Sequence, residues 1–156
     1  MTNNSQHIPA AESLTVEFKS DRKRLSDDEL VQALVCLANT EGGELWLGVE
    51  DDATPTGLHP AHANLTGLPG LIAARTSPAL QITVEAVHVD AANGAVTVAR
   101  ILVPKATHSE VATTSGQYLH RRIKQDGTPE CVAMLPHERT SRSSSIGIFD
   151  ASAQVV

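Results

Sequence analysis

The change of hydrophobic period between residues 14 and 49 constrains the fold of this chain more than any other feature. Apolar and polar residues alternate over residues 14–18, which predicts a strand with one apolar face. Over residues 30–38 the apolar positions follow one stripe of a helix. Alternation returns over residues 45–49. The sequence therefore predicts a strand, a helix and a second strand in direct succession.

Both ends of the predicted helix carry sequence signals. Ser26 and Glu29 form a capping box, in which each side chain can bind a backbone amide of the first turn. Asp27 and Asp28 add negative charge where the helix dipole is positive. Paired glycines at 42–43 supply the backbone freedom that a tight helix exit needs. We expect the helix to begin directly after Ser26 and to end before these glycines.

Later segments add a second helix and a hairpin. The expected elements are a helix over residues 68–74, strands over 82–89 and 96–103, and a short strand over 118–123. Asn93 and Gly94 form a hairpin turn signal. The apolar parity changes near Ala86, which predicts a bulge, and a matching change occurs near Arg100. This order predicts an α+β fold with a mixed β-sheet, a β-α-β-α-β-β core, one further short strand, and helices packed on the sheet.

The length of 156 residues fits one domain. We expect a disordered lead over residues 1–10, the domain over 11–138, and a flexible tail over 139–156 that begins a linker to a further C-terminal part. No apolar run reaches the length of a membrane span, and the first residues lack the apolar core of a signal peptide. We therefore expect a cytoplasmic protein with no membrane partner.

Several motifs for cofactors and disulfides are missing. Cys36 and Cys131 are far apart and suggest no disulfide framework, so we interpret Cys36, in the helical stripe, as a buried and unreactive thiol. His59 and His62 have no further ligands nearby for zinc and are read as loop histidines. Val49 stands where a P-loop needs lysine, which gives no support for ATP binding.

The formal net charge is −6, which argues against a protein that coats nucleic acid through its overall field. The cations are nevertheless clustered, with four in residues 19–24 and three in residues 121–124. Lysine and arginine make most phosphate contacts. Two interpretations remain open: one positive stripe, or two unrelated solvated patches. The candidate nucleic-acid-binding residues are Lys19, Arg22, Lys23, Arg24, His120, Arg121, Arg122 and Lys124.

An acidic group forms a second candidate site. Glu17 and Lys19 are two residues apart on one predicted strand and so leave the same face. Asp51 follows the next strand, and Glu12 precedes the first. Three carboxylates at one edge of a sheet suit a hard divalent cation such as Mg²⁺ or Mn²⁺. The alternative is that Glu17 and Lys19 are ordinary exposed charges on the polar face of a strand.

Four motifs in order resemble one family. They are Glu12-Ser13-Leu14-Thr15-Val16-Glu17-Phe18-Lys19, then Ala38-Asn39-Thr40-Glu41-Gly42-Gly43, then Leu47-Gly48-Val49-Glu50-Asp51, and then Gly57-Leu58. With the later segment at 118–121, they resemble the Schlafen/AlbA-like DNA-binding domain found in bacterial transcriptional regulators. The resemblance covers about residues 12–135. It implies an α+β domain with a mixed sheet, followed by a longer C-terminal part.

The resemblance implies two different functions. The first is nucleic-acid binding, with DNA favoured over RNA and no cofactor required, in a transcriptional regulator. The alternative is a Schlafen-like, divalent-metal-dependent endoribonuclease acting on structured RNA. In that case Glu12, Glu17 and Asp51 would hold Mg²⁺ or Mn²⁺, Lys19 would complete the catalytic set, and a homodimer would be needed to form a clamp. The net acidity also leaves open a domain that binds protein.

Overall fold

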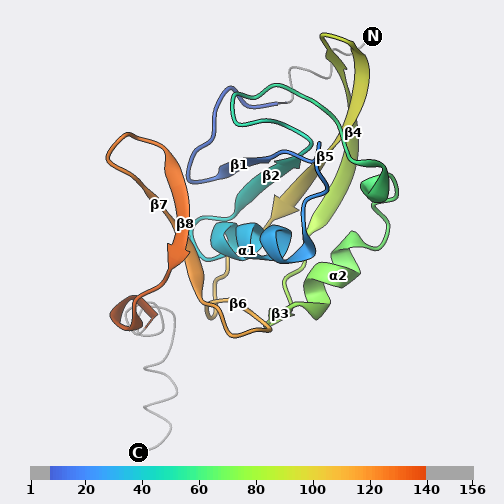
Figure 1. The fold of residues 1–156 in the computed structure, drawn as a ribbon. Coiled ribbons are helices and arrows are strands. Elements are labelled where there is room, and N and C mark those ends of the chain that lie inside the picture. Colours follow the sequence, from blue (N-terminus) through green and yellow to red (C-terminus); the bar gives the residue numbers. More distant parts are fainter. Residues whose placement is uncertain (1–7, 140–156) are drawn as a thin grey trace, which may run out of the picture.

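The computed structural model describes residues 8–139 and contains a four-stranded mixed sheet in the order β1-β2-β5-β4 (Figure 1). The strands are β1 (Val16–Lys19), β2 (Gly43–Leu47), β4 (Thr83–Ala91) and β5 (Gly94–Val103). β1 runs parallel to β2, whereas β5 is antiparallel to both of its neighbours. This mixed sheet with its helices confirms the predicted α+β class.

The helix α1 (Asp27–Ala38) has the predicted ends. At its start, the Ser26 hydroxyl accepts a hydrogen bond from the Glu29 amide at 3.1 Å. At its end, the Gly42 amide donates to the Leu37 carbonyl at 2.8 Å, with Gly42 at φ +71°. Gly43 then brings the backbone so close to Thr15 that a Cβ would collide with it. These contacts direct β2 alongside β1.

Each face of the sheet carries its own hydrophobic cluster. On one face, α1 and α2 (Leu68–Ala74) pack against the strands, and the larger cluster includes Leu34, Leu45 and Ile101. On the other face, a smaller cluster forms around Phe18 and Trp46. The predicted packing of helices on the sheet is therefore found on one face only.

The predicted bulge in β4 is wrong. The β4–β5 register is continuous from Thr83 opposite Leu102 to Ala91 opposite Gly94. The apolar parity changes because the strand serves two cores: Val84 packs against the larger cluster, while Val87 and Val89 belong to the smaller one. A change of buried face along a regular strand therefore produced the pattern of a bulge.

Two small sheets flank the main one. β3 (Thr76–Ser77) pairs with β6 (Ala112–Thr113), and β7 (Leu119–Ile123) pairs with β8 (Pro129–Ala133). β7 confirms the predicted late strand, but β8 was not predicted. The β7–β8 hairpin projects beside the C-terminal end of α1 (Figure 1). There the Asn39 side chain donates to the Leu119 carbonyl at 2.8 Å.

The interpretation of Cys36 as a free thiol is wrong. Cys36 is fully buried, as expected, but it forms a disulfide with Cys131 on β8, and their Cα atoms lie 5.9 Å apart. Their sequence separation of 95 hid this proximity, because β8 itself was not predicted.

The expected lead and tail fall largely outside the described residues, which exclude 1–7 and 140–156. Within residues 8–139, no helix is long and apolar enough to cross a bilayer.

Candidate functional site

The candidate site lies on β1, which is an edge strand of the main sheet. Glu17 pairs in register with Leu45, whose side chain belongs to the cluster beneath α1. Since residues directly opposite share a face, Glu17 and Lys19 point to the α1 side of the sheet. Phe18 points to the other side, where it packs with the smaller cluster. The sequence prediction that Glu17 and Lys19 share a face is consistent with this register.

Glu12 folds back onto this edge strand. Its Oε2 accepts a hydrogen bond from the Phe18 amide at 2.9 Å. Burial, followed by the hydrogen bond to Glu17, raises the pKa of Glu12 to about 7, and the negative charges of Glu17 and Asp51 act in the same direction. Glu12 and Glu17 therefore form a carboxyl pair in which Glu12 keeps its proton to a higher pH than an ordinary glutamate does.

Glu17 keeps the negative charge of this pair. Burial by itself would raise the pKa of Glu17, but the hydrogen bond from Glu12 and the positive charges of Arg121 and Lys19 outweigh burial and lower it. Arg121 Nη1 donates to Glu17 Oε2 at 2.9 Å. The pair is thus asymmetric, with the proton on Glu12 and the charge on Glu17.

Arg121 is an internal part of the site rather than a surface cation. The residue is only 3% exposed. Besides Glu17, its guanidinium donates to the carbonyls of Ser13 and Val16. A buried guanidinium has to be paired, and this one is paired within the domain. The expectation that Arg121 contacts nucleic acid therefore does not agree with its position, although β7 itself is where the sequence placed it.

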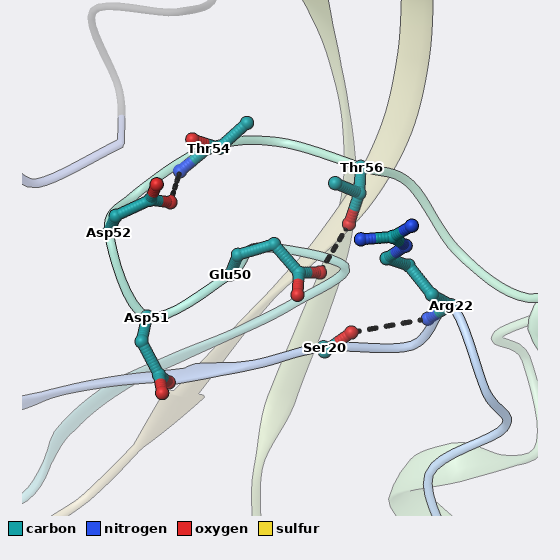
Figure 2. A pocket seen from close by; sticks show the side chains of 7 residues that line it. All are labelled: Ser20, Arg22, Glu50, Asp51, Asp52, Thr54 and Thr56. Carbon is teal, nitrogen blue, oxygen red and sulfur yellow. Dashed lines mark hydrogen bonds between the residues drawn. The ribbon is translucent and has the colours of Figure 1, made fainter.

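Asp51 acts on the carboxyl pair through its charge, which raises the pKa of Glu12. It is exposed, and it lines an open pocket of about 560 Å³ together with Ser20, Arg22, Glu50, Asp52, Thr54 and Thr56. Figure 2 shows the carboxylates of Glu50, Asp51 and Asp52 pointing in three different directions. Glu50 instead binds the Thr56 hydroxyl, and Asp52 accepts a hydrogen bond from the Thr54 amide at 3.0 Å. Among residues 8–139, no three acidic, histidine or cysteine side chains form a group arranged to hold a metal ion.

The basic segment after β1 is held by a residue that sequence reasoning missed. Asp21 is fully buried, and its carboxylate accepts hydrogen bonds from the Leu25 and His59 amides, each at 2.8 Å. Its Oδ2 also lies 2.7 Å from His62 Nδ1. His62 is thus a buried partner of Asp21. A single acidic residue among cations gave no signal of this role, because its partners lie about 40 residues away in the sequence.

Residues 12–129 match the family model described as Schlafen, AlbA_2. The chain belongs to this family. No curated protein is significantly similar to the chain. A similar solved structure is that of the DIP2311 protein from Corynebacterium diphtheriae, with a TM-score of 0.56 and 22% sequence identity. The match covers 78% of this chain and 25% of that protein, so this Schlafen/AlbA_2 domain corresponds to about a quarter of the other chain.

Many cations of the Schlafen/AlbA_2 domain are already paired. Within residues 8–139, salt bridges engage Arg24, Arg75, Arg100, Lys105, Arg121 and Arg122. Arg139 stacks on Tyr118, with its guanidinium carbon 3.6 Å from the ring centre. In the same part of the chain, the cations without a salt bridge or a stacked ring are Lys19, Arg22, Lys23 and Lys124. Unpaired positive charge is therefore concentrated in residues 19–23.

Arg24 of the first predicted cation cluster and Arg121 of the second lie at opposite ends of α1. Arg24 binds Asp27 in the first turn of the helix, whereas the Arg121 amide donates to Thr40 just beyond the last turn. Figure 1 shows the same arrangement, with β7 and β8 beside the C-terminal end of α1. The 12 residues of this helix span about 18 Å. A ligand that touched both Arg24 and β7 would have to extend over this length, whereas Lys19 lies two residues from Glu17, the partner of Arg121.

Proposed function

We propose that this Schlafen/AlbA_2 domain binds nucleic acid, with DNA as its main target, as part of a transcriptional regulator. The observation that carries the proposal is the charge of Arg22 and Lys23, which form no salt bridge and lie next to Lys19 after β1. Arg22 and Lys23 are exposed, and Lys19 is half-buried. Exposed lysine and arginine side chains that make no internal ion pair are free to replace the counterions of phosphates.

The backbone that carries Arg22 and Lys23 is fixed at both ends. Asp21 anchors the segment at one end, and the Ser26 cap fixes it at the other. The cations between them are therefore presented from a backbone of restricted freedom, which lowers the entropy lost on binding. Arg24 and Arg122 form exposed salt bridges with Asp27 and Glu130, and such pairs are weak enough to be exchanged for phosphate contacts.

The mode of binding follows from the scarcity of aromatic residues. They make up 3% of the chain, and two of the four, Phe18 and Trp46, are buried. Stacking platforms for bases are therefore absent from the described surface near residues 19–23. We assign the affinity to backbone phosphates, with His120 and Lys124 at the far end of α1 as secondary contacts.

The test is a salt-dependent binding measurement on duplex DNA and on transfer RNA. Replacing Arg22 and Lys23 together by alanine is expected to weaken binding and to reduce the slope of log K against log salt by about two. Lys105→Ala is the matched control, because Lys105 is an exposed cation already paired with Glu41. An unchanged slope in the double variant would contradict the proposal, and tighter binding to transfer RNA than to DNA would reverse the choice of target.

A second function is favoured by the two neighbouring carboxyls of Glu12 and Glu17 at the edge of the sheet, where Glu12 accepts a hydrogen bond from the Phe18 amide and Glu17 accepts one from Arg121. Two neighbouring carboxyls can lose a proton and bind a divalent cation in its place, because carboxylate oxygens bind both. In this alternative the domain is a metal-dependent endoribonuclease acting on structured RNA. Since these three carboxylates do not form a metal-binding group in the described structure, Asp51 would have to move toward Glu12 and Glu17 for the three to hold Mg²⁺ or Mn²⁺. The ion would supply an activated water, and Lys19 would contact the phosphate.

The enzyme alternative has its own experiment. Labelled transfer RNA is incubated with the protein and Mn²⁺, and with a chelator in place of the metal. Cleavage that requires Mn²⁺ and is lost in Glu17→Gln and Asp51→Asn supports the nuclease. Glu41→Gln is the control, because Glu41 is an exposed carboxylate paired with Lys105. A protein that binds RNA without cutting it at any Mn²⁺ concentration would leave nucleic-acid binding as the function. Sedimentation with RNA tests whether a homodimer forms the clamp.

A further inference from the structure

A closed ring of contacts connects the disulfide with Arg121. Cys131 lies directly opposite Arg121 in the β7–β8 pair, so both side chains leave the same face of the hairpin. Cys131 is bonded to Cys36 in α1. The Cys36 carbonyl accepts a hydrogen bond from the Thr40 hydroxyl at 2.8 Å, and that hydroxyl oxygen accepts one from the Arg121 amide at 2.8 Å.

The two strands of the hairpin are held to the domain in different ways. β7 is held by the Thr40 contact, by Asn39, and by the guanidinium of Arg121. β8 is joined to α1 by the disulfide and by a contact of the Cys131 sulfur with the Gln32 carbonyl at 3.7 Å. No other hydrogen bond or ion pair between β8 and α1 occurs in the part of the chain that the structure describes. The disulfide is therefore the main polar or covalent link between β8 and α1, while β8 itself is paired with β7.

We propose that the Cys36–Cys131 disulfide positions Arg121 on Glu17, and that reduction by a thiol loosens this contact. Arg121 is a positioning residue here, because it binds Glu17 and thereby fixes one carboxylate of the pair. The inference rests on the proposed use of the Glu12–Glu17 pair. When the disulfide is intact, both strands of the hairpin are attached to the rest of the domain. When it is reduced, only the contacts of β7 remain.

The chemistry of the switch is thiol–disulfide exchange with a low-molecular-weight dithiol. Cys131 is exposed and Cys36 is buried, so the attacking thiolate reaches the Cys131 sulfur first. A mixed disulfide forms there and Cys36 leaves as a thiol. The second thiol of the reagent then displaces Cys131. The protein gains two electrons and two protons, and the reagent becomes a cyclic disulfide.

Amide hydrogen exchange on the full chain tests this inference without nucleic acid or metal. The Arg121 amide and its guanidinium protons are compared in oxidised and dithiol-reduced protein. We expect exchange to become about tenfold faster on reduction. The amides of Leu45 and Ile101, in the centre of the main sheet, are expected to keep their rates. Reoxidation is expected to restore slow exchange at Arg121.

Cys131→Ser is the matching variant, because Cys131 is exposed and its replacement leaves the buried Cys36 in place. In this variant, the hydrogen-exchange rate at Arg121 is expected to equal that of reduced wild type and to stay unchanged when the dithiol is added. Equal rates in oxidised and reduced wild type would overturn the proposal, as would a response of Cys131→Ser to dithiol. If the exchange rates change as expected while neither binding nor cleavage is found, the proposed function fails and the positioning role stands.

Discussion

Asp21 Oδ2 lies 2.7 Å from His62 Nδ1 in the interior, where the Asp21 side chain is fully buried. The same carboxylate binds two backbone amides. This contact joins the basic segment after β1 to the loop that contains the short 3₁₀ helix Pro60–His62. Asp21, which directly precedes the exposed Arg22 and Lys23, thus anchors this segment to the interior.

Asp21→Ala is expected to lower the free energy of unfolding by about 3 kcal/mol, because the buried Leu25 amide, the partly buried His59 amide and the buried His62 ring lose their partner. Urea unfolding followed by circular dichroism measures the change. Asp28→Ala is the control, since Asp28 is exposed and has only a surface salt bridge with Arg75. Equal losses in the two variants would show that Asp21 does not anchor the segment.

The carboxyl pair predicts a particular dependence of stability on pH. The pKa of Glu12 is raised in the folded state, so its contribution is full below the unfolded value of 4.5 and is lost as pH rises through about 7. The pKa of Glu17 is lowered, so its contribution is present above 4.5 and is lost as pH falls through the folded value. The two contributions overlap between about pH 5 and 7.

Glu12→Gln keeps the hydrogen-bonding shape of the side chain but cannot ionise. We expect wild type to lose stability from pH 6 to 8 relative to this variant, because only wild type has to ionise Glu12 beside Glu17 (about one proton released). Urea midpoints measured across this range give the difference, and the histidines cancel in the comparison. Parallel curves for the two proteins would contradict the assignment of the proton to Glu12.

The Arg121–Glu17 pair predicts a strong coupling. Arg121→Met leaves the negative charge of Glu17 without its buried partner, and we expect a loss of about 3 kcal/mol in the free energy of unfolding. Glu17→Gln in the same protein is expected to restore part of this loss, because the unpaired charge is then removed. A double-mutant cycle measures the coupling. Additive losses would mean that the two residues act independently.

Gly43 predicts a backbone constraint between β1 and β2. Gly43→Ala is expected to cost at least about 2 kcal/mol, because the new Cβ would collide with the backbone of Thr15 and because φ is +139° there. Gly67→Ala is the control: its φ is −83°, and a Cβ at that position meets no atom within 4 Å. Thermal unfolding of the two variants separates the effects.

The predicted elements that agree with the structure are those with strong local signals. The capping box at Ser26 and the glycine exit at Gly42 placed α1 correctly, because both signals depend on neighbouring residues. β8 was missed because Pro129–Ala133 is short and lacks a regular apolar alternation. The disulfide could not be predicted without β8.

The site was predicted in part, for a physical reason. Glu12 and Glu17 were expected at one edge, and the structure brings them into contact. The position of Arg121 could not be read from the sequence, because an arginine on a strand looks the same whether it faces solvent or a buried carboxylate. Its burial depends on how a separate hairpin docks on α1, which is a long-range property of the fold.

The β4–β5 hairpin supplies residues to both hydrophobic clusters, with Val87 and Val98 on one side of the sheet and Val84 and Ile101 on the other. Unfolding of this hairpin would remove residues from both clusters at once. The two cores should therefore melt together in one cooperative transition, although they are separated by a layer of backbone. A chain with two distinct interiors would then behave as a single thermodynamic unit.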